Sequence, residues 1–147
     1  MTTEMLQLWQ EGRSRFSKIL DLIKEEDLEK KLGNAPNSIG FLIRHIAEVE
    51  LLFSKNVFQN PDVKVIAKTV IDGKDTGVWT NLAELRAIAD ESFQTLKSTI
   101  EAQPEGSWND QVTTKEFGTK TKAEALARVT THAAYHAGQI AIILKYA

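Results

Sequence analysis

The sequence predicts an all-α fold, a four-helix bundle that forms a single domain over residues 1–147. Four long segments repeat apolar residues at steps of three and four, which is the spacing of an amphipathic helix. Longer connections follow the second and third segments, and no repeat or linker divides the chain. A chain of 147 residues without cysteine is long enough to bury a core that needs no disulfides.

The first helix is expected from about Thr3 to about Lys31, because apolar residues recur at helical spacing along this segment. Gly33 then supplies a natural stop. Gly12 lies inside the segment and weakens its helix propensity by up to ~1 kcal/mol. We therefore interpret Gly12 as a position where a neighbouring element approaches closely.

The second helix is expected to begin after Asn37 or Ser38, either of which can cap it, and to run to about Phe58. Pro61 follows just beyond that end. The next segment, from Asn60 to Trp79, contains a β-branched run followed by turn residues. Two interpretations stay open for it, a short extended piece and an irregular crossover.

The third helix is expected to be capped by Thr80 or Asn81 and to end before Pro104. Residues 105–120 are then predicted to form a loop, with or without a small hairpin, because turn residues surround the apolar positions.

The last helix is expected over Thr121–Ala147. Thr121 and Glu124 have the spacing of a capping box, in which a hydroxyl and a carboxylate each satisfy a backbone N–H of the first turn.

Composition excludes several classes of function. A net charge of −2 gives no electrostatic footprint for nucleic acid. No apolar run reaches the ~20 residues of a membrane span, and the first residues lack the hydrophobic core of a secretion signal. We expect a cytoplasmic protein with neither nucleic acid nor membrane as partner.

The chain has three histidines, and all of them fall on the core side of predicted helices. His132 and His136 are one turn apart on the last helix, where two ring nitrogens can converge on one ion. His45 occupies a core-facing position of the second helix. Burial of an unpaired polar group costs roughly 1–3 kcal/mol, so three buried imidazoles call for a common explanation. The pattern predicts a divalent metal held by His45, His132 and His136.

Three neutral imidazoles hold a divalent ion and leave coordination positions open to water or substrate. Because these ligands carry no charge, the ion can lower the pKa of a bound water or thiol strongly, which yields hydroxide or thiolate at neutral pH. Imidazole suits zinc, nickel, iron and copper alike, so the residues do not select the metal. Any thiol must come from outside the chain, which lacks cysteine.

Other interpretations remain for these residues. His132 begins an H-x-x-x-H pattern without the glutamate that metalloproteases carry after the first histidine, which argues against a zincin. Taken singly, each histidine would more often be a core residue than a ligand. Glu48, one turn after His45, is a candidate general base or outer-shell acceptor, with a solvated helix glutamate as the alternative. Gln139, one turn after His136, is a candidate for binding a coordinated water.

Two stretches together resemble the DinB-like family, also called DinB/YfiT-like metalloenzymes. One is NSIGFLIRHIAEVE, in which Ser-Ile-Gly precedes a histidine-bearing helix, and the other is THAAYHAGQIAIIL near the C-terminus. Length and helix count agree over almost the whole chain. The resemblance implies an up-down-down-up bundle with a long crossover, often a homodimer, with His45, His132 and His136 as ligands of a divalent metal.

Relatives of this kind include S-transferases and isomerases that use low-molecular-weight thiols such as bacillithiol, mycothiol or glutathione. The resemblance thus implies a metal-dependent transferase or hydrolase that acts on a small electrophile, with a thiol as cosubstrate and Zn, Ni or Fe as the metal. The alternatives are a non-catalytic bundle that binds a metal or ligand, and an interaction module whose histidines are core residues.

Overall fold

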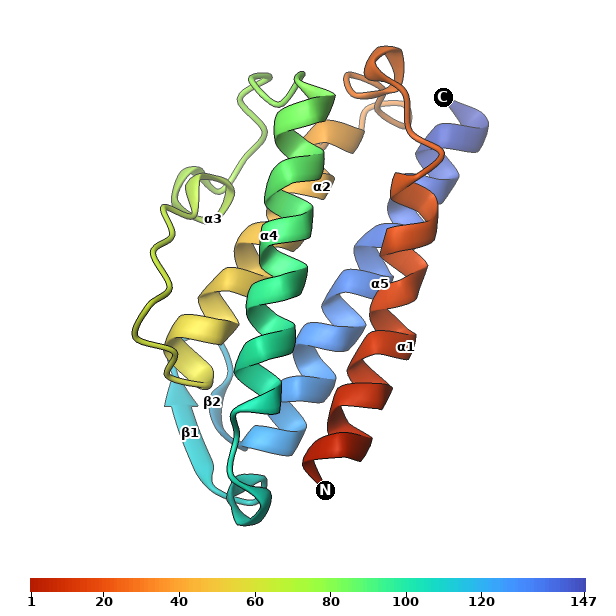
Figure 1. Ribbon diagram of the computed structural model, residues 1–147. Coiled ribbons are helices and arrows are strands. Elements are labelled where there is room, and N and C mark those ends of the chain that lie inside the picture. Colours follow the sequence, from red (N-terminus) through yellow and green to blue (C-terminus); the bar gives the residue numbers. More distant parts are fainter.

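The computed structural model describes residues 1–147 as a mostly helical fold with five α-helices and a two-stranded sheet. The four long helices lie side by side (Figure 1): α1 (Thr2–Leu20), α2 (Ile39–Leu52), α4 (Leu82–Glu101) and α5 (Lys122–Tyr146). Helix α1 packs mainly on α5 and α2 mainly on α4, while contacts of α2 with α5 and of α1 with α4 complete the bundle. None of the helices combines the length and the apolar character that a membrane span requires.

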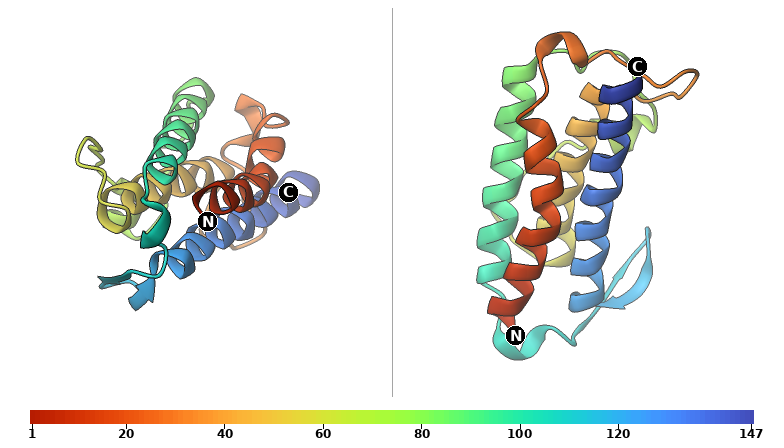
Figure 2. Two further views of the ribbon diagram at one scale, coloured as in Figure 1. Left: turned by 60° about the horizontal axis from the view of Figure 1, so that its bottom comes forward. Right: turned by 90° about the vertical axis from the view of Figure 1, so that its right-hand side faces the viewer.

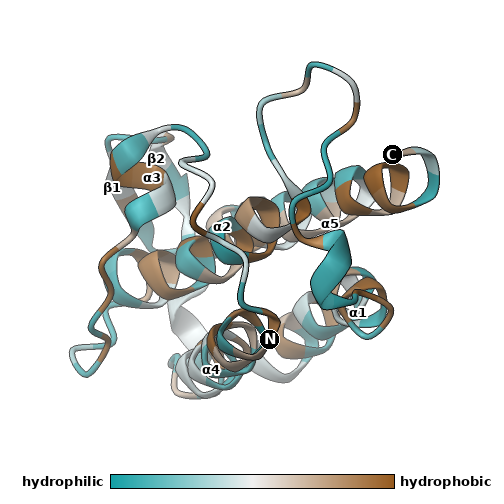
Figure 3. Ribbon diagram, turned by 90° about the horizontal axis from the view of Figure 1, so that it is seen from above, coloured by the Kyte–Doolittle hydropathy of each residue, from teal (hydrophilic) through white to brown (hydrophobic).

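The core fills the space between these helices in two clusters. Hydrophobic residues occur along all four long helices, as Figure 3 shows from above. The first cluster includes Phe16, Ile43 and Ile140, and the second includes Trp9 and Leu96. Full burial of each such side chain contributes about 1.5–3 kcal/mol, so these clusters supply most of the driving force for the bundle.

Helix α1 ends at Leu20, and the prediction that it would continue to about Lys31 is wrong. The chain turns after Leu20 and passes over the end of the bundle with a short 3₁₀ helix, Glu25–Asp27. Asp27 accepts a hydrogen bond from the backbone N–H of Lys24 at 2.9 Å, which offers this backbone an alternative to the helix. Ile23 and Leu28 are both buried in this connection, so apolar positions that a helix would also have buried extended the predicted helix too far.

The expected helix starts are confirmed by their caps. Ser38 accepts a hydrogen bond from the N–H of Phe41 at the start of α2, and Asn81 accepts one from the N–H of Glu84 at the start of α4. Thr121 and Glu124 form the predicted capping box of α5.

Helix α2 continues directly into a π-helical turn, Phe53–Val57, so the helical run reaches the predicted end near Phe58. The chain then returns along the outside of the bundle and forms the five-residue helix α3 (Lys68–Asp72), which packs on α2 (Figure 1). The crossover has no strand, so the irregular interpretation holds, with α3 as an element that the sequence did not indicate.

A small hairpin precedes α5 and projects beside the end of the bundle (Figure 2). Strands β1 (Gln111–Thr114) and β2 (Gly118–Thr121) pair antiparallel, with Gln111 opposite Thr121 and Thr114 opposite Gly118. This confirms the expected loop in its hairpin form.

A buried ion pair joins three of the long helices. The Arg13 guanidinium on α1 donates to both carboxylate oxygens of Glu50 on α2, at 3.3 and 3.1 Å, and to the carbonyl of Ala89 on α4 at 2.9 Å. Ser92 of α4 donates to the same carboxylate at 2.9 Å. Because every partner is hydrogen-bonded, the cluster fixes how α1, α2 and α4 meet.

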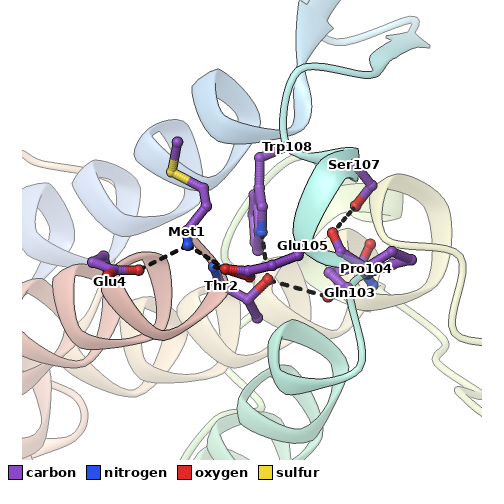
Figure 4. A network of polar contacts seen from close by, with 8 residues as sticks. All are labelled: Met1, Thr2, Glu4, Gln103, Pro104, Glu105, Ser107 and Trp108. Atoms are coloured by element: carbon purple, nitrogen blue, oxygen red, sulfur yellow. Dashed lines mark hydrogen bonds and ion pairs between the residues drawn. The ribbon is translucent and has the colours of Figure 1, made fainter.

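The first residues are tied to the turn that follows α4, as Figure 4 shows. The ammonium group of Met1 pairs with Glu4 at 2.9 Å and also with Glu105. The Thr2 hydroxyl accepts a hydrogen bond from the indole N–H of Trp108 at 2.8 Å and donates to the carbonyl of Gln103 at 3.2 Å. These contacts attach the start of α1 to the connection that leads into the hairpin.

Two glycines mark close approaches between elements. A Cβ at Gly12 would lie 2.3 Å from Cγ2 of Thr130 on α5, which confirms the interpretation of Gly12 as a packing glycine. A Cβ at Gly40 would lie 1.9 Å from the carbonyl oxygen of Trp79. At Gly138, on the exposed side of α5, nothing lies within 4 Å.

We predict that Gly40→Ala lowers the free energy of unfolding by about 1–3 kcal/mol, because the new methyl group meets a backbone atom that cannot rotate away. Gly138→Ala is the matched control and should stabilise the protein by up to about 1 kcal/mol through helix propensity alone. Urea unfolding followed by circular dichroism measures both changes. Equal stability of the two variants would contradict the close approach at Gly40.

Candidate metal centre

The bundle brings the three histidines together between α2 and α5. His45 lies on α2, and His132 and His136 lie one turn apart on α5. One ring nitrogen from each of the three lies within 4.8 Å of the others, and all three residues are half-buried. The ring centroids of His132 and His136 are 4.5 Å apart. Residues distant in the sequence thus form one cluster of possible ligand atoms.

The orientation of His45 is set by a hydrogen-bonded chain from a buried carboxylate. The Thr69 hydroxyl and the Thr69 N–H of α3 both donate to Oε1 of Glu48. Nδ1 of His45 lies 3.0 Å from the Thr69 oxygen. Because the hydroxyl proton goes to the carboxylate, the Thr69 oxygen accepts from His45 Nδ1–H, and the lone pair of that ring resides on Nε2.

Glu48 is itself held in place on its other side. Its Oε2 accepts a hydrogen bond from Nε of Arg44 at 2.6 Å, and the guanidinium of Arg44 lies 4.9 Å from the ring centroid of Trp79. Glu48 is 0% exposed, so the alternative of a solvated helix glutamate is wrong. The carboxylate contacts Thr69 and Arg44 and reaches the histidine cluster through Thr69.

Gln139 orients the ring of His136 in a similar way. Nδ1 of His136 lies 2.7 Å from Oε1 of Gln139. An amide oxygen only accepts, so Nδ1 carries the proton and Nε2 carries the lone pair. The structure therefore places the Gln139 amide oxygen against a histidine ring.

His132 completes the cluster with an unusual contact. Its Nε2 lies 3.1 Å from Nε2 of His45, and its Nδ1 is buried without a hydrogen-bond partner. Nitrogens bound to one zinc ion at about 2.0–2.1 Å in tetrahedral geometry lie about 3.3 Å apart, close to the observed separation. The separation suits a direct N–H···N hydrogen bond between the two rings and also a shared cation, and the donor set fits a divalent metal that accepts imidazole.

All three imidazoles are held neutral, which is the state that binds a metal. Burial lowers the pKa of His45 to about 4 and that of His132 to about 3, with the proximity of His136 as the next cause in both. Burial also lowers the pKa of His136, against the opposing effect of its bond to Gln139. Protons therefore compete weakly with a metal at neutral pH.

Two adjoining cavities open onto the cluster. The larger, about 430 Å³, is lined by His45 and His132, by α2 and the π-helical turn, by Val70 of α3 and by the tip of the hairpin. The smaller, about 310 Å³, also reaches His132 and is lined by Thr131, Tyr135 and Arg128 of α5. Small molecules can thus reach His132 from both cavities and His45 from the larger one, whereas His136 lines neither.

Comparison with protein families identifies the fold. The model of the DinB superfamily matches residues 8–140. The chain belongs to this superfamily. The resemblance inferred from the two histidine stretches is therefore confirmed at the level of the family.

Two solved structures share the fold of this chain. The crystal structure of a mycothiol-dependent maleylpyruvate isomerase is similar with a TM-score of 0.73 and 20% identity, over 95% of this chain and 60% of that chain. A histidine-to-alanine variant of that enzyme is similar with a TM-score of 0.70 and 21% identity over the same shares. The chain thus spans 60% of the length of these relatives, and the likeness shows a common fold. Comparison with curated protein sequences finds no match.

Thr69 is the residue of this DinB centre that sequence reasoning missed. It lies in the crossover, 24 positions after His45, and no periodicity connects the two. A buried glutamate on the core side of α2 was the available signal, because such a carboxylate requires donors from a packed element.

We predict that Thr69→Val lowers the affinity for a divalent metal by roughly 10- to 100-fold, because loss of the hydroxyl frees the His45 ring to rotate and to change tautomer. Thr69→Ser keeps the hydroxyl and should retain affinity within a few-fold. Titration with zinc against a competing chelator measures both. Thr99→Val, at a buried threonine that pairs with Asn60, is the control for general destabilisation. Equal zinc affinity of Thr69→Val and the natural protein would refute this role.

The depressed histidine pKa values predict how the stability of the metal-free protein depends on pH. The unfolded chain takes up histidine protons near pH 6.5, whereas the fold resists them down to about pH 4 at His45 and about pH 3 at His132. Stability conferred by the neutral rings is therefore fully present above about pH 6.5 and is lost as the pH falls toward 4.

Urea unfolding of chelator-treated protein between pH 7.5 and 4.5 tests this expectation. His132→Asn should show a smaller loss over that interval, because one of the resisting groups is gone. An identical pH dependence of the variant and the natural protein would contradict the assignment to the histidines.

Proposed function

We propose that this DinB-superfamily protein is a metal-dependent enzyme that joins a small thiol to a small electrophile, or carries out a related transfer or hydrolysis. The observation that carries the proposal is the convergence of three neutral imidazoles beside two cavities. A purely structural histidine cluster would need no cavities beside it. The mycothiol dependence of the isomerase with the same fold supports a thiol as cosubstrate.

His45, His132 and His136 would hold the metal through one nitrogen each. A divalent cation there would supply Lewis acidity that lowers the pKa of a thiol or water bound to it. The protein contributes orientation, because Thr69 and Gln139 each fix one ring.

We assign Glu48 a positioning role within this site. Both of its oxygens are engaged, by Thr69 and by Arg44, and its side chain is fully buried. This arrangement favours action through the His45 ring over direct transfer of a substrate proton. Gln139 would act similarly through His136.

The proposal also covers the helix order, the location and the oligomeric state of the protein. We propose a single cytoplasmic domain with an up-down-down-up helix order, which the returning crossover between α2 and α4 supports. We also propose a homodimer, for which the exposed apolar side chains Tyr135, Ile142 and Tyr146 on α5 offer a surface. Zinc, nickel and iron are the candidate metals.

We predict that the untagged protein, purified after growth with several divalent metals, carries close to one metal ion per chain. His136→Ala should reduce bound metal to less than about a tenth, because two imidazoles hold an ion far less tightly than three. Elemental analysis measures this content. Leu22→Ala, at an exposed position outside the two helices that carry the histidines, is the control and should retain the metal.

Metal-loaded protein then separates an enzyme from a binding bundle. Conjugation of glutathione, mycothiol or bacillithiol to monochlorobimane should depend on the metal and disappear in His136→Ala. A metal-loaded protein inactive with every thiol would favour the non-catalytic alternative, and absence of metal would overturn the proposal itself.

A further inference from the structure

The larger cavity beside the histidines has a distinctly apolar lining. Its volume of about 430 Å³ falls in the range of small-molecule sites. Half of its twelve lining residues are hydrophobic: Val49, Leu52, Phe53, Val57, Val70 and Phe117. His45 and His132 belong to the same lining, so a molecule in the cavity lies next to the candidate metal centre.

The π-helical turn contributes directly to this cavity. Of its five residues, Phe53, Asn56 and Val57 line the cavity. A π-helical turn is uncommon, and when it occurs it is frequently found at functional sites. Its presence here sets the shape of the cavity wall.

The charges at the hairpin end of the cavity are unequal. Glu116 is paired with Arg128 at 3.2 Å, so its negative charge is compensated. Lys115 has no ion-pair partner, and no other lining residue is basic apart from the neutral imidazoles. The cavity therefore combines an apolar interior with one free cation at its hairpin side.

The smaller cavity offers a separate place for a second reactant. The smaller cavity shares Val49, Phe53, Glu116 and His132 with the larger one but continues over the polar residues of α5. Two reactants can thus meet at His132, one from each cavity, which leaves the larger cavity to the more apolar reactant.

We infer that the larger cavity selects a small apolar molecule that carries an anionic group, with the anion on the Lys115 side and the apolar body among the residues of α2, α3 and Phe117. As the substrate class of the site, this inference rests on the proposed function. Binding to the cavity requires no metal, so this inference and the proposed function can fail separately.

The test uses three probes of equal length, octanoate, 1-octanol and octylamine, and chelator-treated full-length protein at low ionic strength. Removing the metal prevents the carboxylate from binding as a ligand of the ion. Calorimetric titration should show octanoate binding most tightly and octylamine most weakly. Octylamine binding as tightly as octanoate would overturn the inference.

Two neighbouring residues of α3 locate the binding site. Val70 lines the cavity and is 47% exposed, whereas Ile71 is 71% exposed and lies outside it. Val70→Trp should fill the cavity mouth and weaken octanoate binding at least tenfold, and Ile71→Trp should leave it unchanged. Equal effects of the two variants would show that octanoate binds elsewhere and would overturn the assignment.

A charge reversal tests the role of the lysine. Lys115→Glu should weaken octanoate binding roughly three- to tenfold, as expected for an exposed charge that turns from attractive to repulsive, and added salt should reduce the difference. Lys120→Glu changes the same hairpin outside the cavity and is the control. Unaltered octanoate affinity in Lys115→Glu would refute the anionic part of the inference. Metal content of each variant, measured in parallel, reports on the proposed function independently.

Discussion

Burial of three imidazoles between α2 and α5 is the constraint on which the centre depends. Each ring brings two nitrogens into a region with little water, and an unpaired buried nitrogen destabilises the fold. His45 Nδ1 is satisfied by Thr69 and His136 Nδ1 by Gln139, while the Nε2 atoms of His45 and His132 face each other. The short helix α3 therefore has a structural reason to pack on α2, since it delivers the hydroxyl that His45 needs.

Helix α2, which carries His45, is buried on nearly all sides, so the charged side chains within it need partners. Glu48 and Glu50 lie two positions apart on it, at 0% and 1% exposure, and each has its own cationic partner. Glu50 meets Arg13 and ties α2 to α1 and α4, whereas Glu48 meets Arg44 and supports α3. One carboxylate thus fixes the bundle and the other fixes the centre, so that the position of His45 depends on both.

The sequence predicted the features whose causes are local. The caps at Ser38, Asn81 and Thr121 depend on neighbouring residues, and the histidine positions follow from helical periodicity. The end of α1 was not predictable in this way, because Ile23 and Leu28 lie three and eight positions after Leu20, as they would on one helix face, while the turn that buries them depends on the rest of the bundle. Thr69 was also missed, because its contact with His45 depends on how the crossover packs against α2 and not on neighbouring residues.

The division between regular and irregular elements has a consequence for specificity. The histidines lie on long helices whose packing leaves little freedom, whereas the cavity wall is completed by the π-helical turn, α3 and the hairpin tip. Changes in these connecting elements alter the shape and charge of the cavity without moving the helical backbones that hold the rings. Thr69 is the exception, since it lies on α3 beside Val70 and touches His45. Displacement of α3 by a bound molecule would therefore reach His45 and the candidate metal centre through this one hydroxyl, so that α3 couples the cavity to the histidine cluster.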